Sequence, residues 1–427
     1  MKLNHARVLF KGSIILVITF GIFNVLNYFY HFSMIRKLSL ADYGLLATLF
    51  AIIYIVSIFA ESIQTILAKY AASENDGGKL KNLFRRSIKK ATSFALLLFV
   101  AYVTGIFILK YGSIFLASKF LSLPHGAALI LEKLGNLPLG LVIFNGIIIL
   151  GIFLSSVGRG IMQGKKMFGR LGISMIIEGV IKLVLGVLFV YLGWRVYGAL
   201  LGPIIGAFVA FAYTLIAIAP IRKMQEKRIS TPEIYKYSWP VFITTLTVLI
   251  FYNLDIIIAN IVFDRDTVGL YAITALIAKT IFFVTQPINR AMFPLAAEQK
   301  LKSAKKESYN VLMWASISIF ICVVAILAVI HLFPEFIILI ATGKSLPSIE
   351  SLLFYAAIGT SLLSFANTWI LYQLSQGKVR HAALFPIFLV VEAILLYTFS
   401  ANLLEFVLAF MASSAIFLWG SIVLLKE

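Results

Sequence analysis

The sequence contains few charged residues and only one cysteine. Charged side chains make up 13% of its 427 residues, whereas hydrophobic ones make up 61%. A soluble domain cannot bury that much apolar surface, but lipid solvates it directly. The single cysteine, Cys322, lies inside an apolar run, which excludes a disulfide framework and a thiolate metal site. The composition therefore predicts an integral membrane protein.

Acidic residues are scarce relative to basic ones. The chain has 18 Asp and Glu against 37 Lys and Arg, which gives a formal net charge of +19. Nucleic-acid-binding proteins share such an excess, but here the charges lie in short polar segments between apolar runs. Lys and Arg in such segments orient membrane helices and are enriched on the cytoplasmic side. We therefore expect no nucleic-acid partner.

Motifs of catalysis and nucleotide binding are missing from the sequence. It has no His-Glu-x-x-His motif and no glycine-rich phosphate-binding loop. No polar segment is long enough to fold as an extramembrane domain. The acidic pair in Asp264-Arg265-Asp266 is interpreted as a turn between helices, not as a metal and sugar-nucleotide site. We therefore expect no enzyme activity, no catalytic residue, no metal site and no direct use of ATP.

The apolar runs are long enough to cross a membrane as helices. They are continuous instead of alternating, and roughly 20 residues span a hydrocarbon core of ~30 Å at ~1.5 Å per residue. The predicted fold is all-α, with about 12 transmembrane helices. They cover roughly residues 10–33, 43–71, 91–110, 137–163, 171–192, 196–219, 239–263, 268–295, 308–333, 349–375, 381–399 and 402–425. The first run is too long for a signal peptide, so we expect it to be retained.

The longest polar segment divides these helices into six and six. We therefore expect an N-terminal bundle over residues 1–220, a cytoplasmic linker over 221–237 and a C-terminal bundle over 238–427. Placing both termini in the cytoplasm puts roughly three times as many Lys and Arg inside as outside, in accord with the positive-inside rule. The irregular region Ser113–Gly135 is the least well predicted.

A basic hairpin occurs twice in the sequence. The triplet Gln163-Gly164-Lys165 is predicted to end one membrane helix, and the next helix carries Glu178 and Lys182. A weaker copy about 213 positions later has Gln376-Gly377-Lys378, and Glu392 follows at nearly the offset of Glu178. Such a repeat predicts two similar halves in one membrane.

A second repeat opens the second helix of each half. Asp42-Tyr43-Gly44-Leu45-Leu46-Ala47 begins one, and Val268-Gly269-Leu270-Tyr271-Ala272 begins the other. Together with the basic hairpin, Tyr252-Asn253-Leu254-Asp255 and the Phe293-Pro294 pair at the expected end of helix eight, these motifs resemble the oligosaccharide flippase family. This is the Wzx-like branch of the polysaccharide biosynthesis proteins, in the superfamily that also holds the MATE exporters.

The resemblance covers nearly the whole chain and implies a fold and a function. The implied fold is two pseudo-symmetric six-helix bundles in a MATE-like V around a central cavity. The implied function is flipping of lipid-linked oligosaccharides, carried on an isoprenoid phosphate, to the outer leaflet of the plasma membrane by alternating access. Expected partners are this cargo, membrane lipids and other proteins of glycan assembly. Relatives that flip peptidoglycan precursor carry two further helices, which are not predicted here.

Several charged residues fall at predicted bilayer depth, where each costs about 3 kcal/mol or more without a partner or water. Lys and Arg in a cavity of low dielectric constant attract the phosphate of an anionic cargo. The predicted substrate-binding residues are Arg159, Lys182, Lys279 and Arg290, together with Asn24, Asn27 and Tyr28 of the first helix. The coupling ion, a proton or sodium, is predicted to bind Glu61 or Asp255. No other cofactor is expected.

Each of these residues also has a structural interpretation. Glu178 and Lys182 are four residues apart, in the order that favours an intrahelical ion pair. Arg159 and Arg290 lie near helix ends, from which their side chains can reach lipid headgroups. The two predicted ion-coupling acids can instead neutralise inward-facing cations. The polar face of the first helix can also serve helix–helix hydrogen bonds.

Three other functions stay open. A MATE-type ion-coupled antiporter of drugs or organic cations is expected to have an acid in the first helix, which has none. A membrane-embedded polysaccharide polymerase or ligase is expected to have a long external loop with paired Arg or His, and the outer segments are short. A scaffold role is excluded by no feature of the sequence.

Overall fold

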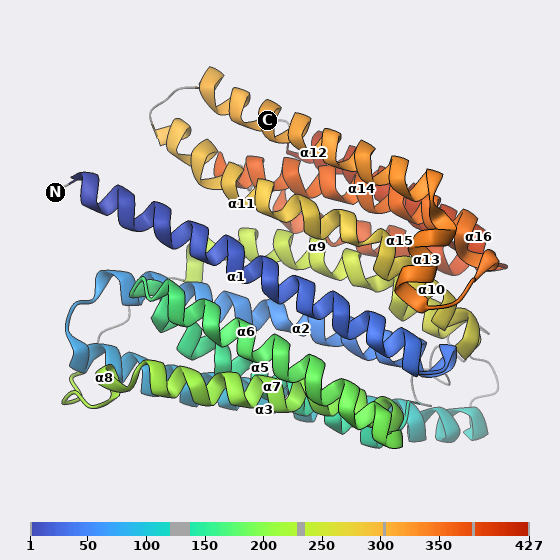
Figure 1. The fold of residues 1–427 in the computed structure, drawn as a ribbon, viewed down its shortest axis with the longest axis horizontal. Coiled ribbons are helices and arrows are strands. Elements are labelled where there is room, and N and C mark those ends of the chain that lie inside the picture. The colour runs from blue at the N-terminus through green and yellow to red at the C-terminus, as the bar shows by residue number, and fades with distance from the viewer. Residues whose placement is uncertain (1, 120–136, 229–234, 302–304, 378–380, 426–427) are drawn as a thin grey trace. The chain divides into compact units, whose positions relative to one another are not determined.

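The fold is all-helical, as predicted. In a computed structural model the described residues are 2–119, 137–228, 235–301, 305–377 and 381–425, and their regular elements are all helices (Figure 1). Helices satisfy their backbone hydrogen bonds internally, which lipid requires. The chain forms two compact units, of which one holds Met1–Leu38 and Ile52–Pro232 and the other Ser39–Ala51 and Glu233–Glu427. Most of the irregular region Ser113–Gly135 lies outside the described residues.

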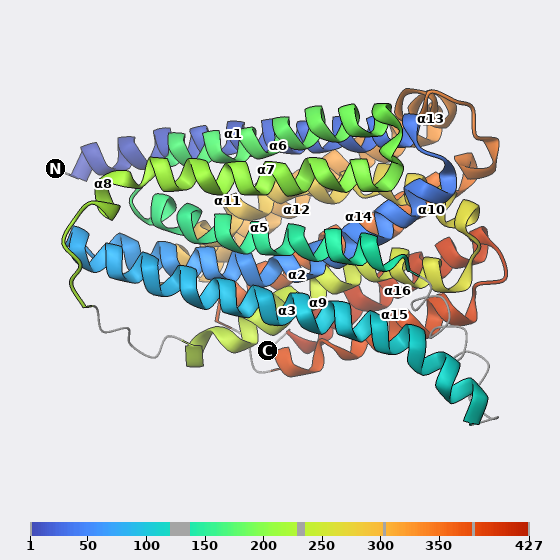
Figure 2. The same ribbon diagram turned by 90° about the horizontal axis from the view of Figure 1, so that it is seen from below.

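The first unit is built from long helices that pack side by side. Helix α6 packs against α1 and α7, and α5 packs against α3 and α7 (Figure 2). The elements are α1 (Lys2–Lys37), the later part of α2 (Leu40–Ser73), α3 (Gly77–Lys119), α5 (Leu139–Gly164), α6 (Phe168–Phe189), the π-helical turn η1 (Val190–Trp194), α7 (Arg195–Ala217) and α8 (Ala219–Arg222).

The second unit is organised around α14. This helix packs against α10, α11, α12 and α16, while α15 packs against α9 and α16. The elements are the start of α2, α9 (Tyr235–Val262), α10 (Arg265–Ala278), α11 (Thr280–Leu301), α12 (Lys305–Leu332), α13 (Pro334–Thr342), α14 (Pro347–Ser375), the 3₁₀ turn η2 (Ala382–Leu384), α15 (Ile387–Thr398) and α16 (Leu403–Leu424).

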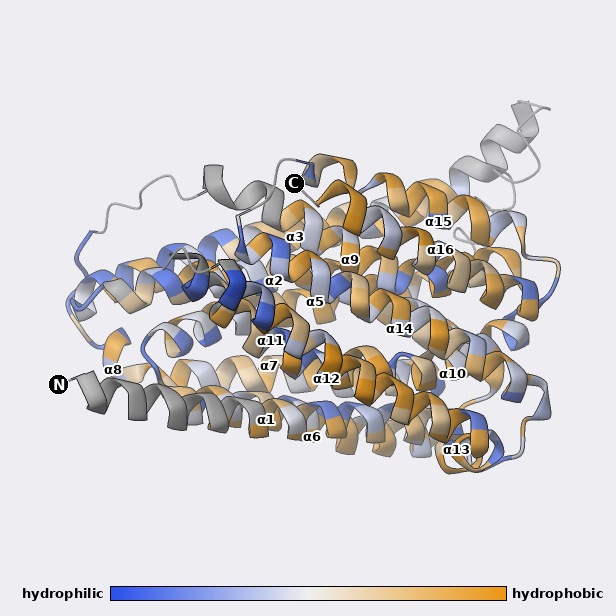
Figure 3. Ribbon diagram, turned by 90° about the horizontal axis from the view of Figure 1, so that it is seen from above, coloured by the Kyte–Doolittle hydropathy of each residue, from blue (hydrophilic) through white to orange (hydrophobic). Residues whose placement is uncertain are grey.

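The helices have the length and hydropathy of membrane spans. Within the described residues, 9 helical segments qualify, and two of them combine neighbouring helices: Phe168–Ala217 runs over α6 and α7, and Arg265–Phe293 over α10 and α11. Hydrophobic residues run along the helices, and hydrophilic ones gather toward their ends and in the loops (Figure 3). The protein is therefore a multi-pass membrane protein. The number of about 12 crossings stays a prediction, and α15, at 12 residues, is shorter than a full span.

Three helix boundaries differ from those predicted. Helix α3 begins at Gly77, ahead of the expected residue 91, so its basic first turns continue into the apolar part. The predicted eighth helix forms one apolar span, Arg265–Phe293, but a single turn residue, Lys279, separates α10 from α11 within it. Helix α11 then continues through Pro294 to Leu301, because a proline within a membrane helix removes only one backbone donor and neighbouring helices support the turn.

The two copies of the second sequence repeat pack on each other in the second unit. A Cβ atom at Gly44 would lie 2.8 Å from the backbone nitrogen of Gly269, and one at Gly269 would lie 2.2 Å from the carbonyl oxygen of Leu40. Only glycine allows the starts of α2 and α10 to approach this closely. This contact explains why both copies of the motif contain a glycine.

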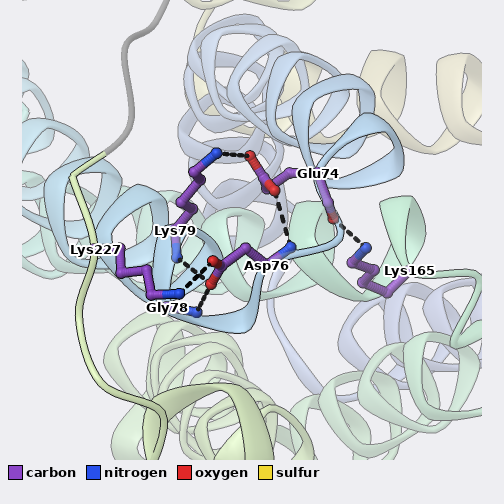
Figure 4. Close-up of polar contacts among 6 residues, drawn as sticks. All are labelled: Glu74, Asp76, Gly78, Lys79, Lys165 and Lys227. Carbon is purple, nitrogen blue, oxygen red and sulfur yellow. Dashed lines mark hydrogen bonds and ion pairs between the residues drawn. The ribbon is translucent and has the colours of Figure 1, made fainter.

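A cluster of charged residues holds the turn between α2 and α3 (Figure 4). The carboxylate of Asp76 accepts a hydrogen bond from Nζ of Lys227 at 2.8 Å. Oε2 of Glu74 lies 3.6 Å from Nζ of Lys79, and the backbone carbonyl of Glu74 accepts a hydrogen bond from Nζ of Lys165. Lys165 thus serves as a cation at the C-terminal end of α2, where the helix dipole favours one.

The segment that follows α8 lies along the first turns of α3. The N–H of Lys227 donates to the carbonyl of Gly78 at 3.1 Å. The carboxylate of Glu226 accepts hydrogen bonds from Asn82 at 2.6 Å and from Arg85 at 3.0 Å. We call Glu74, Asp76 and Glu226 with these partners the surface clasp. It fastens the chain that leaves the first unit to the α2–α3 turn.

The surface clasp is expected to open in acid. Its hydrogen bonds lower the pKa of Asp76, chiefly through Lys227, and the pKa of Glu226, chiefly through Asn82. A carboxyl group with a lowered folded-state pKa stabilises the fold above its ordinary pKa of about 4, and this stability is lost as pH falls through the folded-state pKa. Hydrogen exchange of the Lys227 amide, corrected for the intrinsic rate, should therefore show less protection at low pH than at neutral pH. Equal protection at both would contradict the prediction.

Candidate functional site

Arg159 of α5 is bound to α6 in the first unit. Its Nη2 lies 2.6 Å from Oε2 of Glu178, and it also donates to the Ser174 carbonyl at 3.1 Å. Its Nε donates to Oγ of Ser174 at 3.1 Å. Both charged side chains are largely buried, with exposed fractions of 13% and 17%. The guanidinium of Arg159 is therefore directed at α6 in this structure.

Lys182 lies on α6, one turn after Glu178, and contacts α1. Its Nζ donates to Oδ1 of Asn27 at 2.8 Å and lies 4.5 Å from the ring centroid of Tyr30. The Tyr30 hydroxyl donates to the carbonyl of Ala199 on α7 at 2.7 Å, which fixes the ring. Lys182 is only 7% exposed. An ammonium held by an amide oxygen and an aromatic face retains its attraction for an anion.

Glu178 forms an ion pair with Arg159 and also attracts Lys182 electrostatically. Helix α7 comes close to α6 at this point, because glycines at every fourth position of α7 face α6. A Cβ at Gly202 would lie 2.5 Å from the Lys182 carbonyl oxygen, and one at Gly206 would lie 2.8 Å from that of Glu178. This close approach sets the rotation of α6 that directs one side chain to α5 and the other to α1.

One residue of the polar patch predicted on the first helix, Asn27, contacts Lys182 in the structure. Tyr28 packs its ring 6.1 Å from that of Phe32, and Asn24 is half-buried on α1. Tyr30 belongs to the same polar patch of the sequence, and its spacing of three residues from Asn27 places both side chains on one face of the helix.

A second group of buried charges lies in the second unit. Asp255 of α9 is fully buried, and its Oδ1 lies 2.8 Å from Nζ of Lys279, which is 8% exposed. The Tyr271 hydroxyl donates to Oδ2 of Asp255 at 2.7 Å. Nζ of Lys279 lies 4.8 Å from the ring centroid of Tyr252. Asp255 and Lys279, predicted for different roles, therefore form one ion pair.

This ion pair is located where the helix divides. Lys279 follows the last residue of α10 and precedes Thr280, the first residue of α11. Its carbonyl accepts a hydrogen bond from the Tyr252 hydroxyl at 3.4 Å. Both the side chain and the backbone of Lys279 are thus bound by α9 at the junction of α10 and α11.

Glu392 of α15 joins this second group. It is fully buried and interacts electrostatically with Asp255 and Lys279. Within the part of the chain that the structure describes, neither of its carboxylate oxygens has a hydrogen-bond partner. In the sequence, Glu392 was recognisable as a buried charge of the hairpin repeat, but no role was predicted for it.

Two further residues were predicted as site residues, Glu61 and Arg290. Glu61 is exposed on α2 in the first unit. Arg290 belongs to α11, but its side chain lies outside the described part of the structure. Among the described side chains, no three His, Cys, Asp or Glu residues gather as a metal site.

Comparison with known proteins first defines the class. The structure is similar to an inward-facing multidrug resistance MATE family transporter of the MOP superfamily, with a TM-score of 0.70, 16% identity and coverage of 96% of this chain and 99% of that one. It is also similar to a MOP superfamily transporter from Pyrococcus furiosus, with a TM-score of 0.63, 16% identity and coverage of 98% and 96%. The fold is that of MATE-related membrane transporters.

The family follows from the sequence. The family model described as "Polysaccharide biosynthesis protein" matches residues 9–300, and the chain belongs to that family. This confirms the resemblance identified from the motifs, and the protein is a membrane transporter of this family. A relative, uncharacterized membrane protein MJ1375 of Methanocaldococcus jannaschii, is 24% identical over 298 residues. The match spans 66% of this chain and 66% of the length of that relative.

Proposed function

We propose that the protein flips lipid-linked oligosaccharides from the cytoplasmic to the outer leaflet of the plasma membrane. The cargo is an oligosaccharide joined through phosphate to an isoprenoid lipid, and it moves by alternating access for assembly of a cell-surface polysaccharide or glycan. Both termini lie in the cytoplasm, and other proteins of glycan assembly supply and receive the cargo. The protein transports this molecule and does not alter its covalent bonds.

The observation that carries the proposal is the position of Lys182. A cation at bilayer depth is expensive, and its retention there points to use by a ligand or cargo. Arg159, Lys182 and Glu178 together contribute two positive charges and one negative charge to the core of the first unit. If Nζ of Lys182 donated to a phosphate oxygen in place of Asn27, both partners of the hydrogen bond would be charged, and such a bond is stronger than one to a neutral amide.

The main alternative is export of drugs or organic cations, because one similar structure is that of a multidrug resistance transporter. A cation would gain from an acid on α1, and the sequence of α1 contains neither Asp nor Glu. Its contact with α6 instead surrounds an ammonium group. The chemistry of this site therefore favours an anionic cargo.

The cargo class is tested in proteoliposomes that contain the purified full chain. One preparation carries a fluorescent isoprenoid-diphosphate oligosaccharide in the membrane, and its exposure to an external lectin is followed with time. A second preparation is loaded with a fluorescent organic cation, and its efflux under proton and sodium gradients is measured. Empty liposomes are the control for both.

We expect protein-dependent flipping of the oligosaccharide and no protein-dependent efflux of the cation. Efflux of the cation without flipping of the oligosaccharide would replace the proposal with the drug-antiporter alternative. If neither cargo moves under either gradient, both the proposed function and the drug-antiporter alternative are wrong.

A further inference from the structure

We propose that Glu392 is a proton-binding site, and that its proton determines whether Lys279 is bound by one carboxylate or shared between two. The inference rests on the surroundings of this side chain. Glu392 lies on α15, which packs against α9 and α16. It is fully buried, and in the described structure both of its oxygens are without a hydrogen-bond donor.

The balance of charge among Asp255, Lys279 and Glu392 indicates which of the two acids carries a proton. Asp255 and Glu392 are two acids, and Lys279 is the cation that interacts with both. The group is neutral only if one acid carries a proton. Asp255 receives hydrogen bonds from Lys279 and Tyr271, and both stabilise its anion. Glu392 receives none in the described structure, and an ionised carboxylate buried without donors is strongly disfavoured, so the proton belongs on Glu392.

The neighbouring helices leave few other groups that can exchange this proton. Helix α9 contributes Asp255, and α10 contributes Tyr271, whose hydroxyl also interacts with Glu392. Helix α16 has no charged residue after Glu405, which lies in its exposed first turn. Tyr397 is the other titratable residue of α15, more than one turn further along. Lys279 is therefore the partner available to an ionised Glu392.

Loss of the proton would change the contacts of the helix break. An ionised Glu392 would attract Nζ of Lys279 away from Asp255, and Lys279 is the residue between α10 and α11. Its carbonyl is also held by Tyr252. The proton on α15 thus controls how firmly the break is bound to α9. This deepens the proposed function by naming a proton as the coupling ion, and that consequence rests on the protein being a transporter.

The proposal is tested without transport, by infrared difference spectroscopy of the purified full chain during stepwise changes of pH. A protonated carboxylic acid gives a C=O stretching band that an ionised carboxylate lacks. We expect such a band to persist well above the ordinary Glu pKa of about 4.3 and to vanish as pH rises further. Labelling with ¹³C-glutamate should shift the band, whereas ¹³C-aspartate should leave it unchanged.

The variants identify the residue. Glu392→Gln should remove the band, and Glu335→Gln, at an exposed acid in the first turn of α13, should retain it. A band shifted by labelled aspartate, or its absence from the native chain, would overturn the proposal. Loss of the band on adding sodium at constant pH would also overturn it in favour of a sodium site. If Glu392→Gln fails to fold, Glu392→Asp replaces it, and the band should then shift with labelled aspartate and no longer with labelled glutamate. No result depends on the cargo.

Discussion

Replacing Lys182 by glutamine is expected to weaken binding of an isoprenoid diphosphate by roughly 10- to 100-fold. A hydrogen bond to a charged group contributes about 1.5–3 kcal/mol, and 1.4 kcal/mol corresponds to a factor of ten in affinity. Glutamine retains a donor for Asn27 and removes the charge, so the packing of α1 on α6 is largely preserved. Binding of a fluorescent isoprenoid diphosphate to the purified protein measures the effect.

Two matched variants separate charge from general disturbance. Lys182→Arg keeps the cation and is expected to retain most of the affinity. Lys166→Gln removes a cation from the exposed turn between α5 and α6 and is expected to leave the affinity unchanged. Unaltered binding by Lys182→Gln, or an equal loss in Lys166→Gln, would show that the buried ammonium does not recognise the phosphate.

Removing both acids of the buried charge group in the second unit is expected to destabilise the protein strongly. In Asp255→Asn with Glu392→Gln, Lys279 keeps its buried position and loses both carboxylates. Removing one side of a buried ion pair costs about 3–5 kcal/mol, because the remaining charge is uncompensated. Each single substitution leaves one acid beside Lys279 and should cost much less. Unfolding of the four proteins in one detergent gives the double-mutant cycle.

A third substitution is expected to restore the stability that the double variant loses. Adding Lys279→Met to the double variant removes the uncompensated charge and should restore most of the lost stability, since apolar residues of similar volume often replace buried ion pairs without loss. If the two single costs simply add up to that of the double variant, Asp255 and Glu392 do not share Lys279.

The sequence predicted the helices well because long continuous apolar runs have few alternatives in a membrane. It could not predict the break at Lys279, since Ala278 and Thr280 beside it are ordinary helix residues and neither glycine nor proline is adjacent. The break depends on contacts with α9, which are tertiary. Conversely, Pro294 was expected to end a helix, but α11 continues through it.

The buried charges could also be identified from the sequence, because each of them interrupts an apolar run: Arg159, Lys182, Asp255 and Lys279. The residues that these charges contact could not be identified in this way. Asn27 and Lys182 are 155 residues apart, and the spacing of Glu178 and Lys182 did not indicate that Glu178 also pairs with Arg159. Periodicity gives the face of a helix, but the rotation of α6 is set by its contact with the glycines of α7.

The central claim is that the protein selects its cargo by charge through Lys182. The most direct measurement compares the flipping rates of two matched lipids in the same proteoliposomes, an oligosaccharide on an isoprenoid diphosphate and the same oligosaccharide on an uncharged linker. The native protein should flip the charged lipid faster, and Lys182→Gln should reduce or abolish this preference. Equal rates for both lipids with the native protein would contradict the account.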